Sequence, residues 1–174
     1  MSHTPLKITA LLNEVINEAG DLKNITPYDF TQESKYNYIF YTDDNEKVNV
    51  GFEVMDDYYI KFLTFPPSAQ EDKADGVYNI GFDINGNTTQ YKKTGISYFY
   101  RIMKTVSVII LDFLKQNPNS ILTIVGEGKR GEIGDNQKSR YYLQSTLQNL
   151  PPGYRIGNIK YGPVKGIYVG PIYK

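Results

Sequence analysis

The sequence predicts an α+β fold in which a long central helix and a second helix pack on a mainly antiparallel sheet, with a short amphipathic helix at the N-terminus. Three observations support this fold class. A continuous apolar helical stripe runs from Gly95 to Asn117. Strand-like alternation precedes this stripe, and further strand-like segments follow it. This segregated order of strands and helices is typical of helices that cover one face of a sheet.

The length and composition limit the classes of protein that the chain can belong to. Its 174 residues suit a single domain, 1–174, in which residues 1–34 form a possible N-terminal arm and residues 35–174 the α+β core. The formal net charge is zero, so the overall charge gives no argument for a nucleic-acid partner or an anionic membrane.

Several kinds of reactive site are excluded by the residue types present. The chain has no cysteine, which excludes disulfides, thiol catalysis and thiolate metal sites. His3 is the one histidine, so neither a histidine-based triad nor a multi-histidine zinc site is expected. We therefore expect no catalytic residue, no metal and no cofactor. The sequence does not open on a signal peptide, and we expect a soluble, non-secreted protein that makes no membrane contact.

The first predicted element is the helix that opens at Thr4-Pro5 and ends at Gly20, since Thr can cap a helix and Pro suits its first turn. Its apolar stripe is a candidate docking surface and includes Leu11, Leu12, Val15 and Ile16. Two alternatives remain open: the stripe packs on its own domain, or it docks on a neighbouring chain. A polar stretch, Asp21–Ser34, separates this helix from the sheet.

A meander of four or five antiparallel strands is predicted next, because apolar and polar residues alternate between turn-forming groups. Asp43-Asp44-Asn45 and Asn85-Gly86 are turn signals, and Pro66-Pro67 ends a strand. The polar residues Ser68–Asp75 indicate an exposed loop. The predicted strands are Tyr36–Tyr41, Val48–Val54, Tyr58–Leu63, Tyr78–Ile84 and Thr88–Lys93.

The long helix follows the meander and is stopped by Pro118. Because its apolar residues cover much of the helical surface, other elements must cover it. Ile121–Val125 is then predicted to be a buried strand, and a second helix runs from Asp135 or Asn136 to Leu150. Tyr154–Tyr161 and Gly166–Tyr173 are predicted as closing strands, and Pro163 and Pro171 indicate edge positions for them.

A glycine-rich loop, Gly126–Gly134, lies between a predicted strand and the second helix. Backbone N–H groups at such a position attract phosphates. Lys129, Arg130, Lys138 and Arg140 are therefore candidate interaction or phosphate contacts. The spacing matches neither the Walker nor the dinucleotide pattern, and nearby acidic residues offset the basic charge. A surface connection without a ligand is the alternative interpretation.

Acidic pairs and aromatic residues give two weaker signals. Asp43-Asp44 and Asp56-Asp57 could hold a metal, but Asp is also favoured in turns by its local backbone bonds. Exposed aromatic rings on a sheet could stack on nucleic-acid bases, but such a site also needs basic residues between the rings. Rings that are buried in a core or contact another protein need no basic neighbours. The residues concerned are Tyr36, Tyr38, Phe40, Tyr41, Tyr58 and Tyr59, and basic residues near them are few. We favour core or protein contacts for them.

The second half of the chain resembles small α+β proteins of tailed bacteriophages, which are virion-associated or accessory proteins. The resemblance covers Tyr78–Leu147. It consists of a Thr-Gly turn, a helix with a Thr-Val pair, a Pro stop, a strand and a helix that opens on Ser-Arg with a Tyr close behind. The matching residues are Thr94-Gly95-Ile96, Phe99, Thr105-Val106, Ile109-Ile110, Phe113-Leu114, Pro118, Ile121, Ser139-Arg140 and Tyr142.

The resemblance implies a non-enzymatic structural or assembly protein in the virion or the host cytoplasm, such as a ring component at the head–tail junction. Its partners would be other protein subunits in a homo-oligomer or a multi-protein assembly. The alternative is an accessory protein that binds nucleic acid or nucleotides through the basic residues of the glycine-rich loop. An enzyme such as a toxin nuclease is the least favoured hypothesis.

Overall fold

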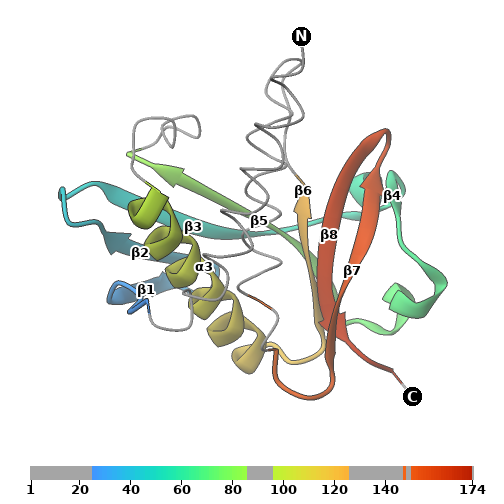
Figure 1. The fold of residues 1–174 in the computed structure, drawn as a ribbon. Coiled ribbons are helices and arrows are strands. Elements are labelled where there is room, and N and C mark those ends of the chain that lie inside the picture. The colour runs from blue at the N-terminus through green and yellow to red at the C-terminus, as the bar shows by residue number, and fades with distance from the viewer. Residues whose placement is uncertain (1–24, 86–95, 126–146, 148–149, 174) are drawn as a thin grey trace, which may run out of the picture.

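The computed structural model describes residues 25–85, 96–125, 147 and 150–173. Within these residues, eight strands form one sheet in the order β1-β2-β3-β5-β6-β8-β7-β4 (Figure 1). The strands are β1 Phe30–Ser34, β2 Asn37–Tyr41, β3 Lys47–Val54, β4 Leu63–Thr64, β5 Gly76–Ile84, β6 Ser120–Val125, β7 Tyr154–Tyr161 and β8 Val164–Pro171. The helices are α2 Asp57–Ile60 and α3 Ile96–Gln116, with 3-10 turns η2 Pro67–Ala69 and η3 Glu71–Lys73.

The sheet is mixed, because β5 and β6 run parallel while the other neighbours run antiparallel. The predicted fold class, a long central helix packed on a mainly antiparallel sheet, is therefore wrong: the molecule is built around one eight-stranded mixed sheet. Helix α3 connects the two parallel strands, and a parallel pair requires such a crossover. Hydrophobic alternation locates each strand but carries no information on its direction, so the sequence did not predict the parallel pair.

Helix α3 spans nearly the range predicted for the long helix and lies across one face of the strands (Figure 1). Its inward side chains are buried in the main core with strand residues such as Val50 and Phe52. These helix residues are Ile102, Met103, Val106, Ile109, Ile110, Phe113 and Leu114. The rings of Phe52 and Phe113 stack at a centroid distance of 3.9 Å, which fixes the helix on the centre of the sheet. Among the described helices, none is long and apolar enough to cross a membrane.

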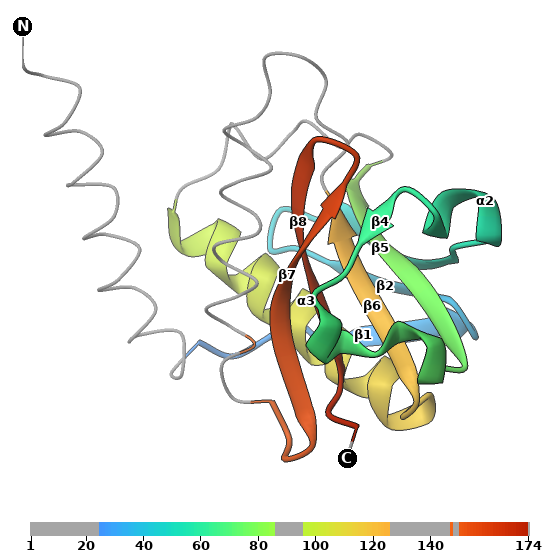
Figure 2. The same cartoon turned by 90° about the vertical axis from the view of Figure 1, so that its right-hand side faces the viewer.

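The opposite face of the sheet carries a second, smaller core. Val77, Ile121, Ile159 and Tyr168 point to this side, and the segment 55–74 covers them with apolar residues that include the buried Ala69. Figure 2 shows α3 and α2 on opposite sides of the sheet. The segment 55–74 covers the part of this face formed by β6, β7 and β8. The loop Ser68–Asp75, which we predicted to be exposed, thus contains a core residue and two 3-10 turns.

The strand predicted at Tyr58–Leu63 is wrong, since residues 57–60 form the short helix α2. The side chain of Asp56 accepts a hydrogen bond from the backbone N–H of Tyr59 at 3.1 Å, which is an N-cap. None of the α2 residues is buried, so the alternation of the sequence here does not correspond to a core face. Local capping by Asp56 therefore decides the conformation.

Two further features of the sheet differ from the prediction. The polar stretch Asp21–Ser34 contains the edge strand β1, whose side chains are almost all exposed and so give no alternating pattern. Strand β8 lies between β6 and β7, and β7 lies between β8 and β4, so the edge positions predicted for these two strands are wrong. The prolines are compatible with the place of β8 because Pro163 lies in the turn before β8 and Pro171 is its last residue.

Several predicted elements lie outside the described residues. These are the N-terminal helix Thr4–Gly20, the returning strand Thr88–Lys93, the loop Gly126–Gly134 and most of the second helix that was predicted to end at Leu150. Leu147, which is described, is buried in the main core, and Leu150 packs against that core.

Candidate functional site

Exposed aromatic rings gather on and beside α2. We call this group the α2 patch; it consists of the exposed Tyr58, Tyr59 and Phe62 and of the half-buried Tyr161 beside them. The side chains of Tyr58, Tyr59 and Phe62 are 60%, 47% and 42% exposed. The rings contact one another edge to face, with centroids 5.4 Å apart for Tyr58–Tyr59, 5.6 Å for Tyr58–Phe62 and 5.9 Å for Phe62–Tyr161.

The α2 patch is held by backbone contacts between segments far apart in the sequence. The N-cap of Asp56 sets the direction of α2, and β4 then pairs with the end of β7, with Leu63 opposite Tyr161. The backbone N–H of Gly162 donates to the carbonyl of Phe62 at 3.0 Å. The Lys61 ammonium group lies 4.3 Å from the centroid of the Tyr58 ring, a cation–π contact that adds a positive charge to the apolar surface.

The α2 patch is rich in residue types that are common in protein interfaces. Tyr and Phe are enriched in the cores of protein interfaces, because a rigid ring buries a large area at a small entropic cost. A continuous group of exposed rings also carries a solvation penalty that a partner would remove. The chemistry available at the α2 patch is therefore burial of apolar area, with phenol hydroxyl groups for hydrogen bonds at its rim.

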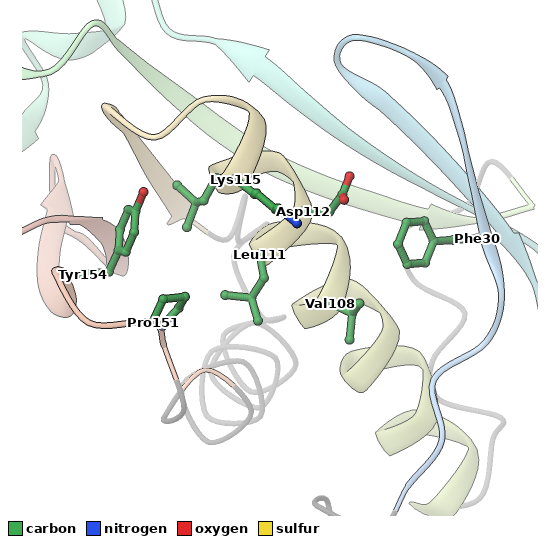
Figure 3. Close-up of a pocket in the computed structure, with 8 residues that line it drawn as sticks. Phe30, Val108, Leu111, Asp112, Lys115, Pro151 and Tyr154 are labelled. Carbon is green, nitrogen blue, oxygen red and sulfur yellow. The ribbon is translucent and has the colours of Figure 1, made fainter.

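A second apolar surface lies on the outward side of α3, where a hollow of about 480 Å³ opens between β1 and the start of β7. Figure 3 shows Val108 and Leu111 at this hollow, with Phe30 on one side and Pro151 and Tyr154 on the other. The apolar stripe of α3 led us to expect that other elements would cover the helix. Val108 and Leu111 are only half-buried, so the described residues leave this side of α3 partly open. The charged residues that line this hollow are Asp112 and Lys115.

A hydrogen-bond network joins the sheet to α3 next to this hollow. The hydroxyl group of the buried Tyr38 donates to Asp112 at 2.9 Å, and the amide of Gln116 donates to the same carboxylate at 2.8 Å. Burial, and then the bond to Asp112, raises the pKa of Tyr38 above its ordinary value of 10.0. A phenol that holds its proton so firmly is a structural donor and is unsuited to act as a base at neutral pH.

One aspartate of each acidic pair in the turns has a structural partner. Asp43 accepts from Arg101 at 3.1 Å and from the hydroxyl group of Tyr28 at 3.3 Å. The guanidinium carbon of Arg101 lies 3.9 Å from the centroid of the Tyr28 ring, and Asp56 caps α2. No group of three or more potential metal ligands occurs among the described residues.

The described structure does not include the residues that we predicted to carry interactions. The candidate contacts Lys129, Arg130, Lys138 and Arg140 lie outside the described residues, as does the docking stripe Leu11, Leu12, Val15 and Ile16. Of the aromatic residues, Tyr38 and Phe40 are core residues, whereas Tyr41, Tyr58 and Tyr59 are exposed. The α2 patch was missed as a unit because its rings were assigned to a strand, although Asp56-Asp57 before them is a helix-start signal.

No protein-family model, curated protein sequence or solved structure matches this chain.

Proposed function

We propose that the protein is a non-enzymatic assembly subunit whose α2 patch binds neighbouring copies of the same chain, as in a ring at the head–tail junction of a tailed bacteriophage. Its place would then be the virion and, before assembly, the host cytoplasm. The observation that carries the proposal is the α2 patch, in which rings 42–60% exposed contact one another at the edge of the sheet. The likeness of the second half of the sequence to phage proteins supports the same role.

The geometry of the patch favours a protein partner over a small ligand. Tyr58 and Tyr59 belong to a four-residue helix that has no buried residue, so their rings lie at the surface, where a neighbouring subunit would cover them. Tyr is among the residues that most often dominate the energy of an interface. A neighbouring subunit that covered Tyr58 and Phe62 would bury apolar area that the described residues leave in water.

Light scattering coupled to size-exclusion chromatography, over a range of protein concentrations, tests this proposal. We expect the wild-type chain to form an oligomer and the double variant Tyr58→Ser/Phe62→Ser to remain a monomer under the same conditions. Truncation of an interface anchor costs about 2 kcal/mol or more, or about thirtyfold in affinity for each residue. At a concentration low enough for both proteins to be monomeric, the double variant should keep the unfolding temperature of the wild type, because neither ring is buried in a core.

Tyr41→Ser is the matched control, since Tyr41 is 53% exposed but lies on β2, away from the α2 patch. It should assemble like the wild type. A wild-type chain that stays monomeric at every concentration and is missing from purified phage particles would refute the proposed function. An oligomer that the double variant forms equally well would show that another surface makes the contact.

A further inference from the structure

A ring assembly requires each subunit to present two different surfaces. A closed ring of more than two copies is built from head-to-tail contacts, in which one surface of a subunit meets a different surface of its neighbour. If the α2 patch bound the same patch of another copy, association would stop at a two-fold dimer. The α2 patch therefore needs a second surface to bind, placed so that one subunit can use both surfaces at once.

The hollow on the outward side of α3 meets this requirement, and we call it the α3 hollow. Val108 and Leu111 line it on the helix. Phe30 lies on one side of it, and Pro151 and Tyr154 lie on the other (Figure 3). Because α3 and α2 lie on opposite sides of the sheet, a subunit can hold one neighbour at each surface (Figure 2).

The charged groups of the two surfaces are complementary. The α2 patch carries the ammonium group of Lys61, which lies over the Tyr58 ring. In the α3 hollow, the carboxylate of Asp112 accepts hydrogen bonds from Tyr38 and Gln116, and both bonds go to Oδ2. Within the described part of the chain, Oδ1 of this carboxylate has no hydrogen-bond donor. It can therefore accept from an ammonium group that a neighbouring subunit supplies.

The area of the exposed rings sets the expected strength of the contact. An aromatic side chain buries about 150–250 Å² when it is fully covered. Tyr58, Tyr59 and Phe62 are 42–60% exposed, so a neighbour that covered them would bury roughly 300 Å² of their surface. A stable interface buries about 800 Å² on each partner, so the rings supply less than half of that area. We therefore expect assembly to depend strongly on protein concentration.

We propose that the α3 hollow of one subunit binds the α2 patch of the next, an inference that rests on the proposed function. Tyr58 and Phe62 lie against Val108 of the neighbouring copy, which removes apolar area from water on both partners. Lys61 faces the carboxylate of Asp112. Each subunit then uses its patch for one neighbour and its hollow for the other, so association continues until the ring closes.

Light scattering coupled to size-exclusion chromatography, applied to a mixture of two variants, tests this pairing. Tyr58→Ser/Phe62→Ser removes the patch and keeps the hollow. Val108→Lys keeps the patch and places a positive charge in the hollow, where it repels Lys61. We expect each variant alone to be a monomer. Their equal mixture should form a one-to-one dimer and nothing larger, because only one intact patch and one intact hollow are present in each pair.

Folding of the hollow variant is controlled in two ways. Val108 packs in neither of the described cores, so Val108→Lys should keep the unfolding temperature of the wild type at low concentration. Formation of the mixed dimer would itself show that both variants are folded. Tyr41→Lys is the matched control, since it adds the same charge at a 53% exposed side chain on β2, and it should assemble like the wild type.

The charge pair gives a second test at an exposed position where folding is not affected. Lys61→Glu places a carboxylate opposite Asp112 and should weaken assembly by about fivefold, the upper range for an exposed ion pair. Lys61→Arg keeps the positive charge and should assemble like the wild type. Equal assembly of Lys61→Glu and Lys61→Arg would overturn the proposed orientation of the patch in the hollow.

The outcomes separate this inference from the proposed function. If Tyr58→Ser/Phe62→Ser is monomeric but Val108→Lys assembles like the wild type, the patch binds another surface. The pairing is then refuted, and the assembly role stands. Two folded, monomeric variants whose mixture gives no dimer would also refute the pairing alone. A wild-type chain that stays monomeric at every concentration would refute both the proposed function and this inference.

Discussion

At the scale of single residues, Tyr38 shows how a buried polar group couples the sheet to the helix. Its ring is fully buried between β1 and the core, and its hydroxyl group reaches Asp112 on α3. Burial raises the pKa of Tyr38, and the bond to Asp112 raises it further. Above pH 10.0 the native state keeps a proton on Tyr38 that the unfolded chain has released. The contribution of Tyr38 to the unfolding free energy is therefore full below pH 10.0 and decreases as the pH rises above that value.

Tyr38→Phe tests this linkage. At neutral pH the variant should lose about 1 kcal/mol of unfolding free energy, because one buried hydrogen bond is removed. Between roughly pH 9 and pH 12 its unfolding free energy should fall less steeply than that of the wild type, since one linked proton is missing. Urea unfolding at a series of pH values measures both effects. Tyr41→Phe, at an exposed ring, should follow the wild-type curve, and an equally steep fall in Tyr38→Phe would contradict the assignment.

At the scale of elements, α3 is tied to the segment before β1 through Thr105 and Arg101. Thr105 is fully buried; its hydroxyl group donates to the carbonyl of Arg101 at 2.7 Å and accepts the backbone N–H of Tyr28 at 2.9 Å. Arg101 donates in turn to the carbonyl of Thr26 at 2.9 Å. Thr105 thus has a structural role in this chain.

Thr105→Val should destabilise the protein by about 1–3 kcal/mol, because Val keeps the shape of Thr but leaves the buried N–H of Tyr28 without its acceptor. The measurement is urea unfolding followed by circular dichroism. Thr31→Val makes the same chemical change on the exposed strand β1 and should alter stability by less than about 0.5 kcal/mol. Equal stabilities for the two variants would show that Tyr28 finds another partner.

The elements also show which parts of the fold can be predicted from the sequence. β3 and β5 were predicted because one face of each is buried, and α3 because its stripe is long and continuous. β1 was missed because its side chains are exposed, and α2 because a side-chain cap outweighs the alternation of its rings. Strand direction, and with it the mixed sheet, follows from long-range pairing that no local pattern contains.

The candidate surfaces were less predictable than the strands. The α2 patch depends on β4 placing Phe62 beside Tyr161, two residues about a hundred positions apart in the chain. The polar row on β3 and β5, in which Asn49 lies opposite Asp83 and Gly51 opposite Gly81, depends on the register of these two strands. Residue types alone could not predict either arrangement, because both are produced by pairing between segments that are separate in the sequence.

At the scale of the whole molecule, the strands β5, β6 and β8 send alternate side chains into both cores. Ile121 and Leu122 are adjacent on β6 and are both fully buried, yet Ile121 belongs to the smaller core and Leu122 to the main core. The two cores therefore share one backbone. Opening either core would expose a strand that the other core needs, so we expect the sheet to unfold as a single cooperative unit.

Ile121→Ala and Leu122→Ala test this coupling. Each should lower the free energy of unfolding by about 2–5 kcal/mol, because each leaves a cavity in a buried site. Each variant should also keep one transition, at the same urea concentration by tyrosine fluorescence and by far-ultraviolet circular dichroism. If Ile121→Ala instead unfolds in two steps, the segment 55–74 and its core can open while α3 stays on the sheet. The α2 patch would then be a mobile attachment rather than a surface held rigid by the main core.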